Sequence, residues 1–294
     1  MSKNPFSIYD FLGYLFPGII TLMLLIFIVS LSKEGKAAEI EDYFRINEFS
    51  RVLTQNDLKR WESTFVAIIL SYIIGHIMAY LSSVSVEYFT NRVFTYPSHY
   101  LLFSERKASW RKLMWRFWFS KDIWRIFYCT ILLILLLPVI IFIIPSTIRR
   151  FITRPLDEYV RNSIQNKLWK LSDTLHLKLP DVNTDADYHR IVMHYVYLNI
   201  PNSQRKADNY VAIYGFLRTH TLIACLFFDY LFWTQVYTIL SSLTVHWKAI
   251  WLLLLVFFMT NILYMGFVKF YRRFTLENYM ALLTEKDNNN IPHV

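Results

Sequence analysis

Polar side chains recur on one side of the second hydrophobic run of the chain. Residues Tyr72, His76, Tyr80, Ser83 and Glu87 follow one another at spacings of four, four, three and four. Because residues three and four apart share one face of an α-helix, this spacing predicts a single polar stripe. An imidazole in such a stripe changes its charge near neutral pH, so protonation of His76 could gate a polar path.

Two later hydrophobic runs each contain a polar residue, Asp229 in one and Asn261 in the other. With four membrane crossings, His76 and Asp229 would each lie roughly 15 Å from the inner end of their helix, and Asn261 roughly 11 Å. Polar groups in hydrocarbon are costly and need a partner or a function. We therefore predict that a pore or its gate is lined by His76, Asp229, Asn261, Tyr72 and Tyr80. The alternative is a buried His76–Asp229 hydrogen bond that only holds helices together.

The hydrophobic runs themselves define the class of protein. The chain is 55% hydrophobic, and its long apolar runs are residues 11–32, 63–86, 126–148, 219–247 and 249–268, with Asp229 as the single charge inside them. A helix needs about 20 apolar residues to cross a bilayer core of about 30 Å. The sequence therefore predicts an all-α, polytopic membrane helical bundle with a small helical cytoplasmic layer.

The distribution of charge sets the predicted orientation. The net charge is +9, and basic residues gather in 87–125 and directly after the last run, at Lys269, Arg272 and Arg273, whereas the loop 33–62 mixes both signs. Lysine and arginine close to spans mark the cytoplasmic side. We therefore expect the loop 33–62 outside and both termini in the cytoplasm.

The run 126–148 conflicts with this orientation, because Arg149 and Arg150 follow it and basic residues also precede it. As a fifth crossing it would place 149–209 and the basic tail outside. As a re-entrant segment broken near Pro138 it would leave them inside, since proline removes a helical hydrogen bond. Hydropathy alone favours five crossings and charge favours four; we predict four.

These assignments divide the chain into four parts: a first transmembrane hairpin (1–87), a cytoplasmic helical region (88–209), a second hairpin (210–273) and a tail (274–294) that is disordered at its end. In the cytoplasmic region an apolar stripe predicts one helix, and it consists of Leu156, Val160, Ile164, Leu168 and Leu171. A second helix is predicted up to Pro201, and 203–218 is expected to continue into the following span.

A basic, tryptophan-rich stretch precedes 126–148. Its cations are Arg106, Lys107, Arg111, Lys112 and Arg116. An interfacial helix on anionic lipid is the simpler interpretation. The alternative is a surface for a nucleotide or nucleic acid, because aromatic rings stack on bases while cations contact phosphate. We name these five residues and Arg218 as candidate ligand contacts.

No motif for catalysis or metal binding is present. The chain contains no phosphate-binding loop, nucleophile elbow or Cys-His cluster, and His189 and His194 are five residues apart and so not on one helical face. We therefore expect no catalytic residues, no metal site, no cofactor and no enzymatic activity.

Several short segments of the chain form a set: residues 9–18 (YDFLGYLFPG), Gly75-His76, 96–98 (YPS), 214–216 (YGF) with Arg218, and 271–274 (YRRF). These segments resemble a group of small bacterial membrane proteins that act as effectors of anti-phage defence, with Hailong-type effectors the nearest in kind. The resemblance covers both ends and the spans but departs across 126–200. It implies an oligomeric channel in the bacterial inner membrane, held shut until a nucleotide or nucleic-acid signal changes.

The sequence thus predicts a homo-oligomeric channel, taken as a tetramer, whose cytoplasmic helices respond to such a ligand or to an operon-encoded partner. Its alternative is a non-conducting membrane scaffold that binds a cytoplasmic partner. A transporter is less favoured because no inverted repeat is evident, and a lipid-modifying enzyme would need a polar cluster at headgroup depth.

Overall fold

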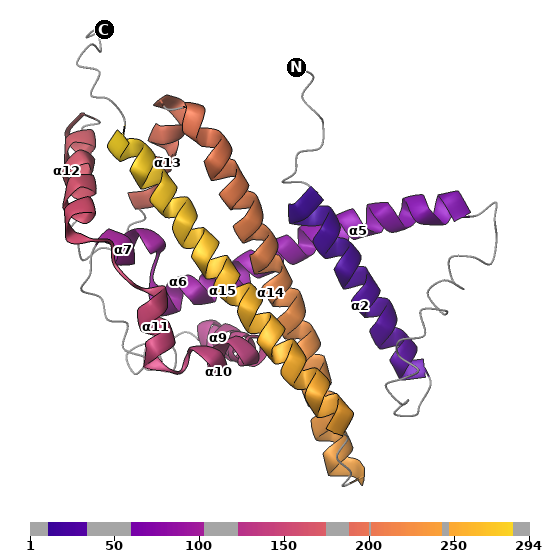
Figure 1. Ribbon diagram of the computed structural model, residues 1–294. Helices are drawn as coiled ribbons and strands as arrows, with labels where there is room; N and C mark the ends of the chain where they lie inside the picture. Colours follow the sequence, from indigo (N-terminus) through magenta and orange to yellow (C-terminus); the bar gives the residue numbers. More distant parts are fainter. Residues whose placement is uncertain are drawn as a thin grey trace. The chain divides into compact units, whose positions relative to one another are not determined.

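The computed structural model describes residues 11–33, 60–102, 123–174, 188–199, 201–242 and 247–284 (Figure 1). All regular structure in these ranges is helical, which confirms the predicted all-α class. Most of the loop 33–62, the five cations of the tryptophan-rich stretch and the end of the tail lie outside the described residues. The predictions made for them stay predictions.

Four helical stretches are long and apolar enough to cross a membrane: Phe11–Ile28, Thr64–Leu102, Lys206–Ser242 and Trp247–Thr284. The chain is therefore a multi-pass membrane protein by helix length and hydropathy. Two stretches are single unbroken helices, α14 (Pro201–Ser242) and α15 (Trp247–Thr284). The predicted continuation of 203–218 into the following span is confirmed, and α15 extends through the first part of the predicted tail.

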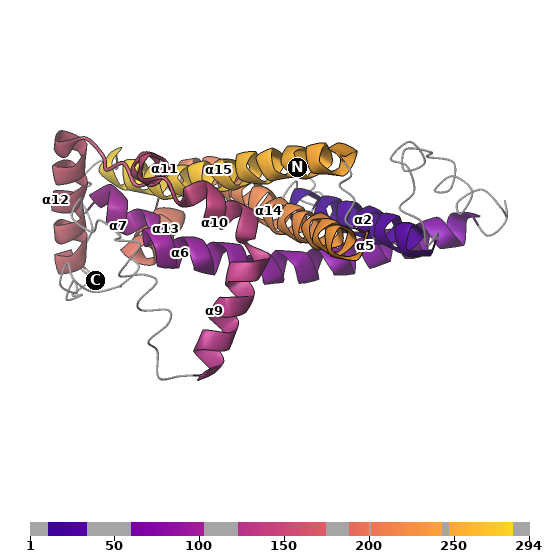
Figure 2. The same ribbon diagram turned by 90° about the horizontal axis from the view of Figure 1, so that it is seen from below.

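The disputed run 126–148 is bent. Helix α9 (Ile123–Leu135) and helix α10 (Leu137–Ile143) meet at Leu136 with an angle of 83°, and Figure 2 shows α9 leaving the direction of α10. Pro138 is the second residue of α10, where a missing N–H costs no helical hydrogen bond. At 1.5 Å per residue the two arms are about 20 Å and 11 Å long, so neither alone crosses about 30 Å of hydrocarbon. The predicted break is confirmed, and five spans result only if the bent pair is counted as one.

The chain divides into two compact units. Unit 1 comprises Met1–Phe89, Asp122–Ile143 and Ala212–Phe267, and unit 2 comprises Thr90–Lys121, Ile144–Val211 and Val268–Val294. The bent pair α9–α10 thus groups with the membrane helices of unit 1.

The first hairpin of unit 1 is held by contact between two backbones. A π-helix, η1 (Phe11–Leu15), leads into α2 (Phe16–Lys33), which packs against α5 (Arg60–Ser82). A Cβ on Gly18 would overlap the carbonyl of Ser71, and a Cβ on Gly75 would overlap the carbonyl of Tyr14. Small residues allow such close approach between membrane helices. Because Tyr14 faces Gly75 and Gly18 faces Ser71, the two helices run antiparallel.

The second hairpin of unit 1 pairs α14 with α15, and Figure 1 shows the two side by side. The ring centroids of Tyr214 and Phe267 lie 6.4 Å apart, and those of Phe228 and Phe257 lie 6.1 Å apart, so the helices are antiparallel. Small polar residues on these helices are buried, and their hydroxyls bond to their own backbone: Thr221 to Leu217 and Thr260 to Val256. Such bonds satisfy a hydroxyl without water.

Unit 2 has its own apolar core. Helix α12 (Glu158–Thr174) packs on α7 (Pro97–Leu102), all six residues of which are buried. The core also includes residues of α13 (Tyr188–Asn199) and the end of α15; its members are Leu102, Ile164, Leu168, Leu171, Val192, Val196, Tyr279, Ala281 and Leu282. The predicted apolar stripe is confirmed, with Leu156 and Val160 packed at its edge.

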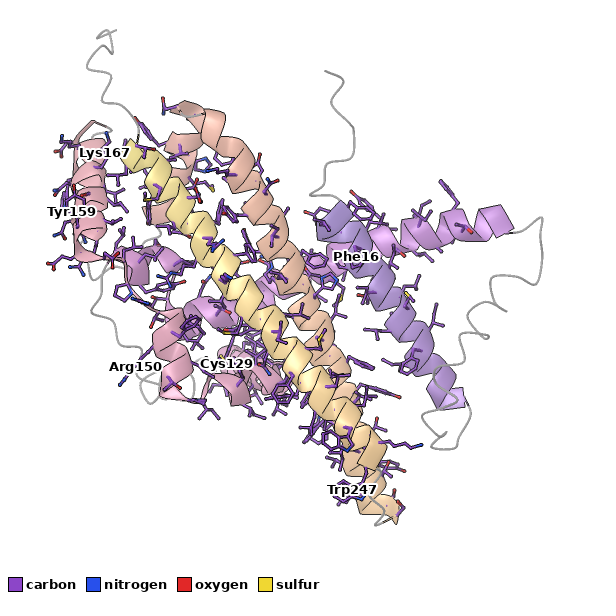
Figure 3. The ribbon with its side chains drawn as sticks, in the orientation of Figure 1. Phe16, Cys129, Arg150, Tyr159, Lys167 and Trp247 are labelled. Carbon is purple, nitrogen blue, oxygen red and sulfur yellow. The ribbon has the colours of Figure 1, made fainter. Side chains whose placement is uncertain are left out.

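Side-chain hydrogen bonds fasten the helices of unit 2. Gln165 donates to the carbonyl of Leu102 at 2.9 Å, which satisfies the end of α7. The phenol of Tyr197 on α13 donates to Asp208 on α14. Burial raises the pKa of Tyr197, and this bond together with the carboxylate charge raises it further, to about 12. The phenol therefore stays protonated at neutral pH. Figure 3 shows Tyr159, which is 83% exposed, standing out from α12.

The close backbone contact makes a clear prediction for Gly75→Ala. The added methyl group meets a carbonyl that cannot turn aside, so we expect a loss of about 3 kcal/mol or more in free energy of unfolding, at the upper end for an overpacked core. Unfolding of the purified protein in mixed micelles, followed by circular dichroism, measures it.

Gly215→Ala is the matched control, because a Cβ at Gly215 meets no atom within 4 Å. There we expect no loss, or a gain of up to about 1 kcal/mol from the better helix propensity of alanine. Equal stability of the two variants would contradict the proposed contact.

Candidate functional site

A largely buried ion pair with several hydrogen bonds joins α5 and its continuation to α14 in unit 1. Arg218 on α14 forms an ion pair with Glu87 through Nη1, donates from Nε to Ser82 Oγ at 3.1 Å, and donates from Nη2 to the carbonyl of Ala79 at 3.4 Å. The hydroxyl oxygens of Ser82 and Thr219 lie 3.3 Å apart beside it. The side chains of Arg218 and Glu87 are only 14% and 22% exposed. Two opposite charges are thus buried together. Charged side chains within a membrane are tolerated when they pair with one another.

The sequence explains why this pair sits where it does. Glu87 directly follows the apolar run 63–86, and Arg218 directly precedes the run that starts at Thr219. Each charge therefore marks the same kind of boundary, the end of an apolar stretch. Long charged side chains at such boundaries keep their heads at the level of the lipid headgroups.

Two π-helical segments shape the site. The segment η2 (Ser83–Glu87) continues α5 and carries Glu87, whose carboxylate also accepts from Ser83 at 3.5 Å. The other segment, η1, carries Tyr14. π-Helices make up well under 1% of residues in proteins and occur frequently at functional sites. Here both π-helical segments contribute residues to the same cavity.

The cavity lies within unit 1 and has a volume of about 280 Å³. The first hairpin lines it with Gly13, Tyr14, His76, Ala79, Tyr80 and Ser83, and α14 lines it with Gly215, Arg218 and Thr219. Arg218 is the permanently charged side chain of this lining, and Glu87 is not part of it. His76 is exposed and Tyr80 is 68% exposed, so the cavity opens onto the surface of the unit.

Aromatic contacts order the part of the cavity lining that the first hairpin supplies. The ring of His76 stacks on Tyr14 with centroids 3.8 Å apart and 16° between the planes, and the ring of Tyr72 meets His76 edge-on at 4.6 Å. The ring centroid of Phe16, which is labelled in Figure 3, lies 5.8 Å from the ring centroids of both Phe216 and His220 of α14. The contacts of Phe16 pack the first hairpin against α14.

The structure places the sequence-predicted residues in two groups. Tyr72, His76, Tyr80 and Arg218 lie at or beside the cavity. Asp229 lies on α14 eleven residues beyond Arg218, about 16 Å along the helix. Neither a hydrogen bond nor an ion pair joins Asp229 to His76 in the described part of the chain, so the structure does not bring this predicted pair together.

Asn261 lies on α15 and is 3% exposed. Its amide donates to the carbonyl of Phe257 at 2.7 Å, and its side-chain oxygen has no hydrogen-bond partner among the described residues. Asn261 is therefore a buried polar group away from the cavity lining. Its assignment to a pore stays a prediction.

Several residues of the site were not predicted. Glu87 was predicted as part of the polar stripe and Arg218 as a ligand contact, but the ion pair between them was not predicted. The signal was available, because a lone acid and a lone base stand at the ends of two apolar runs. Gly13, Tyr14 and Gly215 gave no signal as cavity residues, since their role depends on how the helices meet.

Fold and site define a multi-span helical membrane protein, and no described group of three or more His, Cys, Asp or Glu residues could hold a metal ion. No protein-family model matches the chain, and no curated protein or solved structure is significantly similar to it.

The ion pair makes a quantitative prediction. In a double-mutant cycle with Arg218→Gln and Glu87→Gln, we expect a coupling free energy of about 1.5–3 kcal/mol, because each single change leaves a largely buried charge without its partner. Denaturation of the four proteins in mixed micelles measures it.

The matched control is the pair Arg161–Glu158 on α12, which is 3.9 Å apart with Glu158 81% exposed. Exposed pairs of this spacing contribute about 0.2–0.5 kcal/mol. Coupling of the Arg218 pair no larger than that of the control would show that solvent screens it.

Proposed function

We propose that the chain is a homo-oligomeric, channel-forming membrane protein without enzymatic activity, gated by a cytoplasmic ligand. The observation that carries this proposal is the surface of α5. His76 and Tyr80 are exposed on a helix that otherwise presents apolar side chains, among them Ile73 and Ile77. A polar group that faces lipid costs several kcal/mol, so such a surface favours water or a second protein surface as its neighbour.

If several copies form a ring, this surface of each copy faces either the water-filled centre or a neighbouring copy. Each copy would present Tyr72, His76 and Tyr80 to a central path, while the apolar residues of α2 and α15 face lipid. Rings of polar side chains at close quarters are a usual way to select and gate ions. Asp229 and Asn261 are further candidates for the path. The number of copies is taken as four.

The role in the cell is proposed from the sequence. The segments 9–18 and 214–218 support an effector of bacterial anti-phage defence in the inner membrane. The signal would be a nucleotide, a nucleic acid or an operon-encoded protein, received by the basic residues between Arg106 and Arg116.

A second copy at the α5 surface is tested by cross-linking. Cys129 and Cys225 are buried and free, so the wild-type chain serves as the blank. In native membranes we expect Tyr80→Cys to give covalent dimers with a short bis-maleimide, because its side chain would face the same region of a neighbour. Ile262→Cys is the control, since Ile262 is 66% exposed among apolar residues of α15. Equal yields from both variants would argue against a specific α5 interface.

Conduction is tested in proteoliposomes loaded with a potassium-sensitive dye. We expect His76→Ala to change the flux several-fold, because it removes the imidazole that would line the polar path. Ile77→Ala is the matched control: it truncates the next exposed residue of α5, which is 53% exposed and apolar, and should leave the flux unchanged.

Candidate ligands, including mononucleotides and short oligonucleotides, are added to each preparation. Negligible flux from the wild-type protein under all of them would reject the channel. Co-purification of one stoichiometric cytoplasmic partner in that case would support the alternative, a membrane scaffold.

A further inference from the structure

We propose that the cavity beside Arg218 binds an anionic phosphate group, of the kind carried by a phospholipid headgroup. This inference stands apart from conduction, because it concerns what occupies the cavity whether or not the chain passes ions.

The charge of the lining supports an anion. Arg218 supplies a permanent positive charge, and no acidic side chain, including its partner Glu87, is among the lining residues. Tyr14, Tyr80 and His76 add groups that can donate hydrogen bonds. The hydroxyl of Thr219 donates to the carbonyl of Gly215 at 2.9 Å. The other polar side chains of the lining can donate hydrogen bonds, so the cavity suits a ligand that accepts them.

The guanidinium retains capacity for such a ligand. Arginine carries five N–H donors, and three of those of Arg218 are used by Glu87, Ser82 and the carbonyl of Ala79. Two N–H donors have no described partner. A planar guanidinium matches the oxygens of a phosphate in pairs, which makes arginine well suited to this group.

Size and depth favour a headgroup over a larger ligand. The cavity volume of about 280 Å³ falls just below the roughly 300–1,000 Å³ of typical small-molecule sites. Its charged lining residue, Arg218, stands directly before an apolar run, and such boundaries lie near the level of phospholipid phosphates. The exposed side chains of His76 and Tyr80 leave an entrance on the surface of the unit.

Gly215 keeps the space open. An added Cβ at this position meets no atom within 4 Å, although Gly215 lies in the interior of a 42-residue helix, where glycine costs about 0.5–1 kcal/mol relative to alanine. A larger side chain there would enter the cavity. That property provides a second variant besides Arg218.

The test uses the full-length protein in a neutral detergent and follows its Tm as ligand is added. Short-chain dioctanoyl phosphatidylglycerol supplies the phosphate on a lipid, dioctanoylglycerol supplies the same chains without it, and glycerol phosphate supplies the group without chains. Binding to the folded state raises Tm as a function of ligand concentration and gives an apparent Kd.

We expect phosphatidylglycerol to raise the Tm and dioctanoylglycerol not to. Arg218→Gln should weaken the apparent Kd at least about tenfold, the loss of one charged hydrogen-bonding partner. Gly215→Leu should weaken it similarly, because the leucine side chain occupies the cavity. Arg273→Gln removes an exposed arginine outside the cavity and should leave the Kd unchanged, which separates the site from general attraction between basic protein and anionic lipid.

The arms also identify the source of the phosphate. A shift with phosphatidylglycerol alone indicates a membrane lipid, and a shift with glycerol phosphate as well indicates that soluble phosphate compounds suffice; both support the cavity. An equal shift with dioctanoylglycerol, an unchanged Kd in Gly215→Leu, or no shift in any arm would overturn the proposal.

Discussion

Hydrocarbon offers no hydrogen bonds, and the contact between α5 and α14 shows how this chain meets that constraint. Arg218 satisfies Glu87, Ser82 and the carbonyl of Ala79 at once, so one side chain joins two helices whose membrane-spanning parts are mostly apolar. An arginine left without these partners would make the contact unfavourable, because a buried charge without its counter-ion costs several kcal/mol. The cavity lies beside this contact, because the side chain of Arg218 both joins the two helices and lines the cavity.

Apolar packing contributes differently in the two units. In unit 2, α12 buries Ile164, Leu168 and Leu171 as any soluble amphipathic helix would. In unit 1 many large apolar side chains are exposed, including Phe65, Ile68 and Phe258. Lipid solvates such surfaces, so helix contact there depends on close backbone approach and on polar contacts.

The sequence predicts the elements of this fold well and their contacts less well. Long apolar runs and an apolar stripe of period 3.6 identify the spans and α12, because both signals are local. The bend at Leu136 was predicted from Pro138 and from conflicting charge on the two flanks. The stacking of His76 on Tyr14, and not on a partner in α14, depends on the register between α2 and α5. Glycines set that register, and a missing side chain leaves little trace in a periodic pattern.

The contact of Gly18 and Gly75 with opposing carbonyls has a mechanical consequence. Two backbones in direct contact have no side-chain layer that could repack, so α2 cannot slide on α5 without a clash. The described parts of α2 and α5 therefore move together where they touch. Because the cavity is lined by residues of the first hairpin and by residues of α14, a shift of this helix pair relative to α14 would change the width of the cavity.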